Sequence, residues 1–196
     1  WHTVDVKDSP VKVPSVMVSD GPHGLRKQAD AADNLGINDS IVAVCFPSAA
    51  GLAASFDTEL MVKTGEALGE ECQAENVSTI LGPAINIKRS PLCGRNFEYY
   101  SEDGFLSSEI GRYEVKGIEE KGVRVVMKHF ALNDCEQDRI GLGVWLNEQA
   151  AREIYLRAFQ GALEDSQAGG NGVMMAYTRW GTQWSGGNDG LVKGIL

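Results

Sequence analysis

The feature that most constrains the fold is the alternation of apolar runs with amphipathic helical stretches. The apolar runs lie at residues 14–19, 41–46, 77–87, 123–127 and 172–176. They are largely continuous and do not place a polar residue at every second position. Strands buried on both faces of a parallel sheet have this pattern, whereas half-exposed antiparallel strands alternate apolar and polar residues. The sequence therefore predicts an α/β protein with a parallel sheet.

Helical periodicity between and after these runs completes the pattern. It is found at 58–76, 104–121, 148–163 and 189–196. Asp57 and Asn147 precede two of these helices, and their side chains are suited to accept the first backbone N–H groups. Gly122 stands where the second helix is expected to end. About five strand–helix units result, roughly five-eighths of a (β/α)8 barrel, although an open doubly wound sheet has the same local pattern.

Several α/β chemistries lack their sequence motif. Gly141-Leu-Gly143 has no third glycine at the spacing of a dinucleotide fingerprint. The three histidines lack the His-Glu-x-x-His spacing, and the four cysteines include no Cys-x-x-Cys pair. A Gly-x-Ser-x-Gly elbow for a serine nucleophile is also missing. We therefore expect no cofactor, no metal and free thiols.

Charge and hydropathy restrict the partners and the location. The chain has 18 basic and 27 acidic side chains, a formal net charge of −9. Nucleic-acid binders usually present a basic surface to phosphates, so no nucleic-acid partner is expected. The longest apolar run, 41–46, is far shorter than the roughly 20 residues that span a bilayer, so no membrane span is expected. No signal peptide is visible, which favours the cytoplasm. Both ends, at Trp1 and Leu196, look like cuts in a longer chain.

Polar residues follow the predicted strands at the positions where each strand ends. They are Asp20, Arg95, Glu98, Lys128, His129 and Tyr177. In a barrel these positions meet at the carboxyl-terminal mouth, where ligands bind. Taken one at a time, they also suit a turn aspartate, a loop ion pair, a structural histidine and a core tyrosine. Their coincidence at several strand ends favours a binding site.

The chemistry of this set favours a ligand with many hydroxyl groups. Asp20 is an acceptor, Lys128 is a point cation, and arginines at 26, 95 and 139 are forked donors. Carboxylates accept neighbouring O–H groups, and a guanidinium bridges adjacent oxygens. Phosphate is the competing ligand. However, no Gly-rich nest opens a helix here, and Asp20 would repel an anion.

Three long strings carry a resemblance to a known family. They are SDGPHGLR at 19–26, GPAINIKRSPLCGRNFEYYSED at 82–103 and KHFALNDCEQDR at 128–139. From about residue 1 to residue 196, the chain resembles the amino-terminal barrel of the family-three glycoside hydrolases of the β-glucosidase type. The helix at 148–159 and the strand at 174–177 are also in register. The resemblance implies that residues 1–196 form an incomplete (β/α)8 barrel that stops before the nucleophile strand.

The same resemblance implies roles for individual residues. Asp20 would hold hydroxyl groups at the far edge of a non-reducing-end glucose, and Tyr177 would lie near the anomeric carbon. The remaining contacts in the −1 subsite would come from Arg26, Arg95, Lys128, His129 and Arg139. Hexosaminidase members carry the string KHFPGH, whereas ALND follows Phe130 here. A glucosidase or related exo-glycosidase is therefore favoured, with glucose or β-glucosides as the partner and no cofactor.

Neither catalytic carboxylate of a retaining glycosidase is identifiable in these residues. The family's nucleophile is an aspartate that ends the next strand, and its acid/base comes from a following α/β sandwich domain. Glu98, Glu102 and Asp103 belong to a motif that supports the sugar-binding loop in the family. We therefore expect the sugar-binding part of an exo-acting β-glucosidase that is inactive by itself. The alternatives are a non-catalytic carbohydrate-binding half-barrel that complements a second chain, and phosphorolysis in place of hydrolysis.

Overall fold

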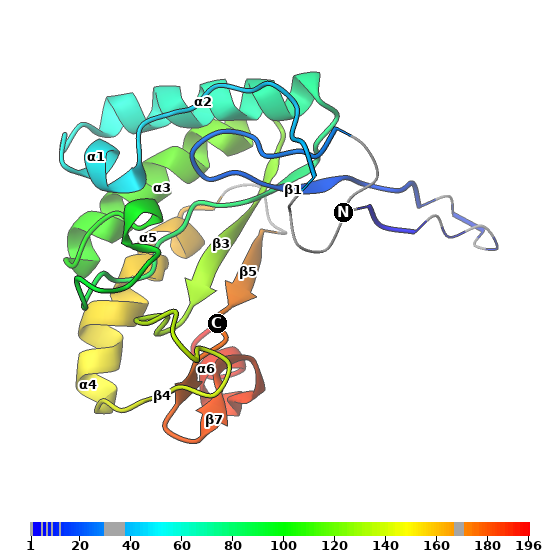
Figure 1. The fold of residues 1–196 in the computed structure, drawn as a ribbon. Helices are drawn as coiled ribbons and strands as arrows, with labels where there is room; N and C mark the ends of the chain where they lie inside the picture. The colour runs from blue at the N-terminus through cyan, green and yellow to red at the C-terminus, as the bar shows by residue number, and fades with distance from the viewer. Residues whose placement is uncertain are drawn as a thin grey trace.

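A parallel sheet forms the centre of the computed structural model, which describes residues 2–4, 6, 8, 10–11, 13–29, 38–166 and 171–196. Its strands are β1 (Val18–Asp20), β2 (Thr79–Leu81), β3 (Arg124–Phe130) and β5 (Gly172–Met175). They pair in the order β1-β2-β3-β5, and every pairing is parallel (Figure 1). The predicted α/β class with a parallel sheet is confirmed.

Helices cover one face of this sheet. The long ones are α2 (Thr58–Ala74), α3 (Gly104–Glu120) and α5 (Arg157–Glu164), which lie side by side (Figure 1). Short elements complete the chain: α1 (Ala49–Ala53), 3-10 turns at Asn96–Glu98 and Ser185–Gly187, α4 (Glu148–Ala150), a π-helical stretch (Ala151–Leu156) and α6 (Asp189–Val192). A small second sheet contains β4 (Gly143–Val144), β6 (Arg179–Trp180) and β7 (Gln183–Trp184). No helix among the described residues is long and apolar enough to cross a bilayer.

The helix boundaries follow the capping residues. The carboxylate of Asp57 accepts the backbone N–H of Leu60 at 2.9 Å, and the side chain of Asn147 accepts that of Ala150 at 2.8 Å. Gly122, with φ of +75°, follows the end of α3, where the left-handed conformation suits glycine. The predicted caps are confirmed.

The core lies between the helices and the sheet. It contains Met61, Leu68, Cys72, Ile80, Ile110, Ile118, Val125 and Met127, all at most 1% exposed. The backbones of α2 and α3 touch where Gly65 faces Gly117. A Cβ at Gly65 would collide with the carbonyl oxygen of Glu114, and one at Gly117 would collide with that of Val62. No residue larger than glycine fits this crossing without separating the helices.

The prediction of a strand at 41–46 is wrong, so the parallel sheet in the described chain has four strands instead of five. The segment runs beside the turn that follows β1. The N–H of Ile41 bonds the carbonyl oxygen of Lys27, and that of Phe46 bonds the carbonyl oxygen of His23, both at 2.9 Å. Val42 is fully exposed. This apolar run therefore stabilises a loop and does not join the sheet, because its backbone N–H groups bond carbonyl oxygens of the neighbouring turn.

Strand β3 is longer than predicted. We expected it to end at Met127, but Lys128 pairs with Met174 and Phe130 with Met175. The register shifts between Lys128 and Phe130, and the peptide bonds Lys128–His129 and Phe130–Ala131 are cis. Two of the predicted site residues thus belong to the carboxyl end of a strand and not to the loop after it.

Candidate functional site

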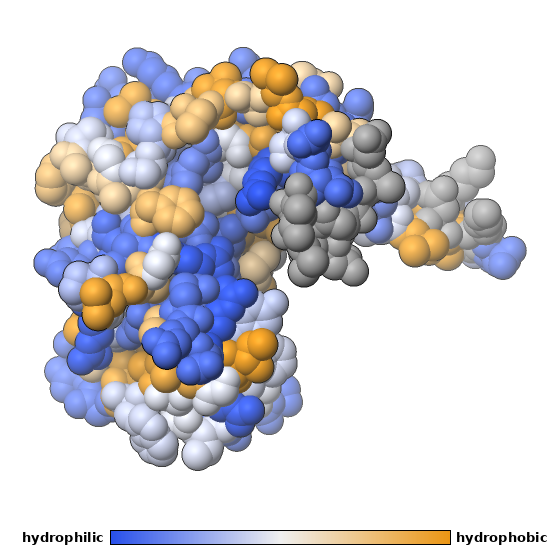
Figure 2. All heavy atoms as spheres, viewed as in Figure 1, coloured by the Kyte–Doolittle hydropathy of each residue, from blue (hydrophilic) through white to orange (hydrophobic). Residues whose placement is uncertain are grey.

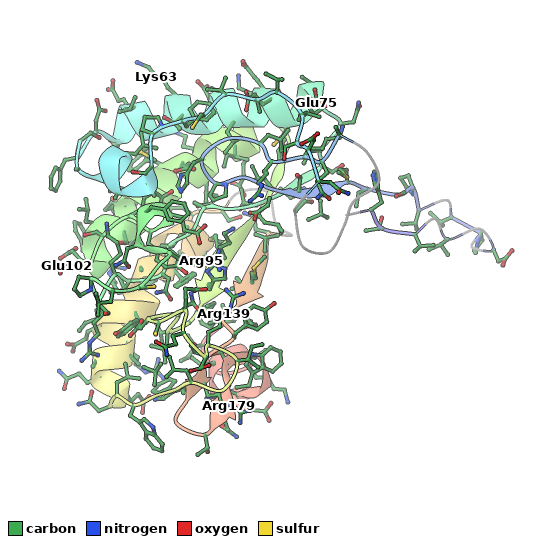
Figure 3. The ribbon with its side chains drawn as sticks, viewed as in Figure 1. Lys63, Glu75, Arg95, Glu102, Arg139 and Arg179 are labelled. Carbon is green, nitrogen blue, oxygen red and sulfur yellow. The ribbon has the colours of Figure 1, made fainter. Side chains whose placement is uncertain are left out.

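Polar side chains gather at the carboxyl ends of β1 and β3. A band of hydrophilic residues runs down the middle of the molecular face beside the ends of β3 and β5 (Figure 2). Arg95 and Arg139 come from different loops and both lie in this region, whereas Lys63 and Arg179 lie at the periphery (Figure 3). The site is therefore at the sheet edge that the strand-end pattern predicted.

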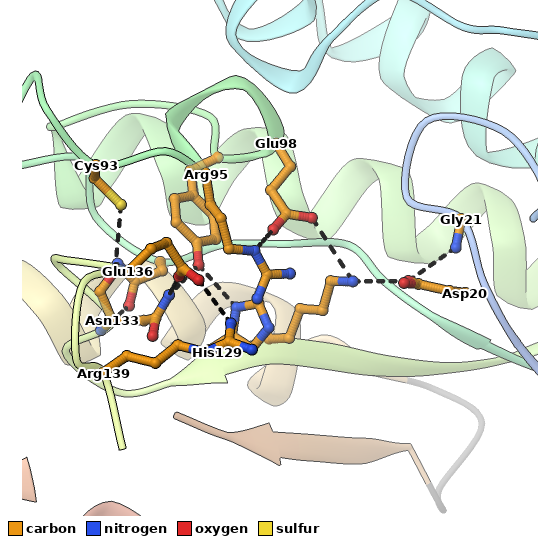
Figure 4. A network of polar contacts seen from close by, with 12 residues as sticks. Asp20, Gly21, Cys93, Arg95, Glu98, His129, Asn133, Glu136 and Arg139 are labelled. Carbon is orange, nitrogen blue, oxygen red and sulfur yellow. Dashed lines mark hydrogen bonds and ion pairs between the residues drawn. The ribbon is translucent and has the colours of Figure 1, made fainter. Parts of the chain in front are cut away.

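Lys128 is the buried cation at the centre of the site. Its Nζ lies 2.8 Å from Oδ1 of Asp20 and 3.7 Å from Oε2 of Glu98 (Figure 4). Glu98 also forms an ion pair with Arg95. The side chain of Lys128 is only 2% exposed, whereas that of Asp20 is 48% exposed. Two carboxylates thus compensate the buried ammonium group, and one of them remains open to a ligand.

A second chain of hydrogen bonds begins at His129. Its Nδ1 lies 2.8 Å from the hydroxyl of Tyr99, which also accepts the Nδ2–H of Asn133 at 2.9 Å. The same Asn133 Nδ2 donates to Oε1 of Glu136 at 2.7 Å, and Oε2 of Glu136 accepts from Arg139 at 2.6 Å (Figure 4). This chain joins β3 to the loops that carry Tyr99 and Arg139.

Burial and positive neighbours keep the histidine neutral. Burial, together with the positive charges of Arg95, Lys128 and Arg139, lowers the pKa of His129 to about 2. Burial also lowers the pKa of the neighbouring His23. The imidazole of His129 is therefore an uncharged hydrogen-bonding group at ordinary pH.

Six of the seven predicted residues belong to two side-chain networks that start from the adjacent residues Lys128 and His129. The first contains Asp20, Lys128 and Arg95. The second contains His129, Arg139 and Tyr177, the last through the guanidinium of Arg139, which lies 4.6 Å from its ring centroid. The seventh, Arg26, is exposed, and its backbone N–H bonds the carbonyl oxygen of Asp20 at 2.8 Å. The predicted loop ion pair between Arg95 and Glu98 is also present.

Sequence reasoning did not foresee four supporting roles. Glu98 holds Lys128 as well as Arg95, and Tyr99, Asn133 and Glu136 connect His129 to Arg139. All four lie within the strings at 82–103 and 128–139. The available signal was the three-residue spacing between acid and base in Arg95–Glu98 and Glu136–Arg139.

The arrangement presents one accessible carboxylate beside several donors, which suits a ligand that both donates and accepts hydrogen bonds. Asp20 accepts, while Lys128, Arg95 and Arg139 donate. Among the described residues, no cluster of His, Cys, Asp and Glu side chains is arranged to hold a metal ion. A polyhydroxylated ligand fits these donors and acceptors.

Comparison with known sequences gives the same family over the whole chain. The family described as "Glycosyl hydrolase family 3 N terminal domain" matches residues 2–196. Thermostable beta-glucosidase B of Acetivibrio thermocellus is 49% identical over 196 residues, which cover 100% of this chain and 25% of that protein. An exo-alpha-(1->6)-L-arabinopyranosidase of Bifidobacterium longum is 43% identical over 197 residues, covering 100% of this chain and 26% of that protein. The chain thus spans about a quarter of the length of these curated relatives.

Solved structures agree with this assignment. A GH3 beta-glucosidase of Bifidobacterium adolescentis superposes with a TM-score of 0.88 at 40% identity, over 100% of this chain and 27% of that one. The beta-glucosidase of Kluyveromyces marxianus in complex with glucose superposes with a TM-score of 0.90 at 35% identity, over 100% of this chain and 22% of that one. With its strings, its parallel sheet and its polar strand ends, the chain belongs to glycosyl hydrolase family 3.

Proposed function

We propose that this chain supplies the sugar-binding cradle of a retaining, exo-acting β-glucosidase that removes terminal non-reducing β-linked glucose. The −1 subsite would be formed by Asp20, Arg26, Arg95, Lys128, His129, Arg139 and Tyr177. The observation that carries the proposal is the half-exposed carboxylate of Asp20 beside the buried Lys128. A carboxylate fixed by a cation accepts two neighbouring hydroxyl groups of a sugar without moving.

The catalytic carboxylates are proposed to come from outside residues 1–196. A retaining glycosidase needs two carboxyl groups about 5–5.5 Å apart, one to attack and one to protonate the leaving group. Each carboxylate of the cradle already bonds a cation: Asp20 bonds Lys128, Glu98 bonds Arg95, and Glu136 bonds Arg139. These groups suit binding and positioning. The 196 residues would then be part of a (β/α)8 barrel, completed by further strands and an α/β sandwich domain.

The first test is the native intact mass of the purified material together with turnover of p-nitrophenyl β-D-glucoside. A mass near 21.2 kDa should be accompanied by no turnover. A larger polypeptide that contains this chain should hydrolyse the substrate with retention of configuration. Turnover by the 196 residues alone, or no turnover by the larger polypeptide, contradicts the proposal.

The second test is Asp20→Ala, in the larger polypeptide for kinetics and in this chain for glucose titration by calorimetry. KM should rise and kcat should fall together, because a remote hydroxyl contact stabilises the transition state as well as the bound substrate. Asp189→Ala is the matched control, since Asp189 pairs with Lys193 on the exposed surface. Unchanged kcat/KM in Asp20→Ala contradicts the role given to this carboxylate.

A second candidate function is a non-catalytic, carbohydrate-binding half-barrel that pairs with a second chain. Among the described residues, β1 and β5 are the outer strands of the parallel sheet, and an outer strand can pair with a strand of another chain. A native complex of two different chains that binds glucose without turnover would support this candidate over the first.

The 43% identity to an arabinopyranosidase makes p-nitrophenyl α-L-arabinopyranoside the second substrate to assay. Phosphorolysis is assayed by adding inorganic phosphate. A cytoplasmic location is proposed, and cell fractionation tests it.

A further inference from the structure

The hydrogen bonds around Asn133 fix the orientation of its amide group. Glu136 is bonded to Arg139 through Oε2, and its Oε1 lies 2.7 Å from Nδ2 of Asn133. A carboxylate in an ion pair accepts hydrogen bonds and donates none. The Asn133 atom that faces it must therefore be the NH2 group, because the amide oxygen would repel the carboxylate.

This orientation of the Asn133 amide determines which hydrogen bond the hydroxyl of Tyr99 accepts and which it donates. Nδ2 of Asn133 lies 2.9 Å from the Tyr99 oxygen, so its second hydrogen is donated there. The Tyr99 hydroxyl has one hydrogen of its own, and Nδ1 of His129 lies 2.8 Å away. In the described part of the chain, this nitrogen is the acceptor that lies within reach of the hydroxyl hydrogen, and a buried hydrogen without an acceptor is costly, so Tyr99 donates to His129.

The ring of His129 then has one possible protonation pattern. Its Nδ1 accepts the Tyr99 hydrogen and is unprotonated, and a neutral imidazole carries its single proton on the other nitrogen. The ring is neutral because burial and three cationic neighbours, Arg95, Lys128 and Arg139, oppose a positive charge. Among the described residues, the hydrogen bond of the His129 ring is the one at Nδ1, and Nε2 is not one of the fully enclosed atoms that lack a partner. Its N–H group is available to a ligand.

We propose that Glu136, acting through Asn133 and Tyr99, holds His129 as the Nε2–H tautomer, so that this ring donates a hydrogen bond to the bound ligand. Glu136 is a positioning residue, and the same carboxylate also orients Arg139. The identity of the ligand as a sugar rests on the proposed function. The tautomer itself rests on the hydrogen bonds and on the burial of the ring among cationic neighbours, and does not depend on the identity of the ligand.

The proposal has a consequence for specificity. His129, Lys128 and Arg95 all present donors, and Asp20 is the accessible acceptor nearby. The edge of the ligand that faces His129 must therefore offer an oxygen as an acceptor. A sugar in which that oxygen is replaced by hydrogen loses this contact.

The test is a long-range 1H–15N spectrum of the histidine ring nitrogens in this chain. There are only three histidines, so His129→Gln identifies the signals of His129. We expect an unprotonated Nδ1 and a protonated Nε2, unchanged between about pH 5 and about pH 8 because the ring stays neutral. A protonated Nδ1, or an imidazolium within this range, overturns the proposal, and this measurement needs no variant of the relay to fold.

Two variants test the relay. Tyr99→Phe removes the hydrogen donated to Nδ1 and should shift the tautomer ratio toward Nδ1–H by up to roughly tenfold, the factor that one hydrogen bond supplies. Glu136→Gln should shift it in the same direction by less, because glutamine can still accept from Asn133. Tyr113→Phe deletes a hydroxyl on α3 outside the network and should leave the His129 signals unchanged. An unchanged ratio in Tyr99→Phe overturns the relay.

Glucose titrations of the same samples separate this inference from the proposed function. Native chain that shows the Nε2–H tautomer but binds no glucose contradicts the proposed function and leaves the tautomer assignment supported. Native chain that binds glucose but shows another tautomer overturns this inference alone. If both hold, Tyr99→Phe should weaken glucose binding about three- to tenfold, as loss of one oriented donor predicts.

Discussion

Tyr99 and Tyr100 are adjacent in the sequence and both are buried, with 0% and 3% exposure, yet their hydroxyl groups lie in different parts of the molecule. Tyr99 bonds His129 and Asn133 in the candidate site. Tyr100 bonds the carboxyl group of Glu114, on helix α3 in the core. Two adjacent residues of the loop after β2 thus face different regions, one the binding site and the other the core.

The two regions neutralise their buried ionisable groups in different ways. Lys128 lies between two carboxylates, so opposite charges compensate it. No basic side chain among the described residues forms an ion pair with Glu114, and burial raises its pKa to about 7, so the carboxyl group keeps its proton in acidic solution. The candidate site therefore contains charged side chains that can bind a ligand, whereas the core contains a protonated, uncharged carboxyl group in acidic solution. The predictions below test this difference.

The largest effect is expected for Glu98→Ala. This change removes the partner of Arg95 and one of the two carboxylates beside Lys128. Removing one member of a buried ion pair typically costs about 3–5 kcal/mol, because a charge is left without compensation. Urea unfolding measures the loss, and Glu98→Gln should lose less because it keeps the hydrogen bond. A loss below about 1 kcal/mol in Glu98→Ala would mean that the charges of the site do not compensate one another.

Glu114→Gln should remove a pH dependence from the folded state. The carboxyl pKa is 4.5 when unperturbed and about 7 in the fold. The folded protein therefore binds this proton more tightly, and its stabilisation is complete below about pH 4.5. As pH rises from about 4.5 to about 7, the free energy of unfolding should fall by about 3 kcal/mol. Glutamine stays neutral and should abolish this fall.

Urea unfolding from about pH 5 to about pH 8 measures the difference between the wild type and Glu114→Gln. Glu120→Gln is the matched control, because Glu120 is on the same helix and its side chain is 47% exposed. Parallel pH profiles of the wild type and Glu114→Gln would contradict the neutral-acid interpretation.

Removing each tyrosine hydroxyl in turn should distinguish an effect on unfolding free energy from an effect on glucose binding. Tyr100→Phe leaves the Glu114 carboxyl without its partner, and Tyr99→Phe leaves His129 without its donor. Each should cost about 1–3 kcal/mol in unfolding free energy, the range for an unpaired buried polar group. Only Tyr99→Phe should weaken glucose binding in calorimetry. Equal effects of both variants on glucose would remove the distinction between the two regions.

Arg139→Lys should have the smallest effect on stability. The side chain of Arg139 is 33% exposed, and substitutions at such positions usually change the unfolding free energy by about 0.5 kcal/mol or less. Lysine keeps the charge beside Glu136 but loses the planar group over Tyr177. Thermal unfolding should therefore be nearly unchanged while glucose affinity falls several-fold. A large loss of unfolding free energy would mean that Arg139, like Glu114, mainly stabilises the fold.

The sequence predicted those parts of the molecule that depend on local pattern. Continuous apolar runs indicated strands buried on both faces, and Asp57 and Asn147 marked helix starts by their capping chemistry. The clustering of Asp20 with Lys128 followed from the rule that parallel strands end at one edge. These inferences needed no knowledge of long-range contacts.

Other parts depended on contacts that a pattern does not contain. Apolarity alone did not distinguish a sheet strand at 41–46 from an extended segment bonded to the turn beside it. Tyr99 and Asn133 carried no strand-end signal, because their role depends on a meeting of two loops. Glu114 did have a signal, since it lies four residues after Ile110 on the apolar face of α3.

The glycine crossing of α2 and α3 has a consequence for the order of folding. Gly65 and Gly117 lie inside these helices, and each glycine lowers helix stability by roughly 0.5–1 kcal/mol relative to alanine. In proteins most helical stability comes from packing of an apolar face, so neither helix is expected to persist on its own. Each gains its stability when the other is docked against it. The two helices should therefore form together and not one after the other, and the folding nucleus should include residues from both.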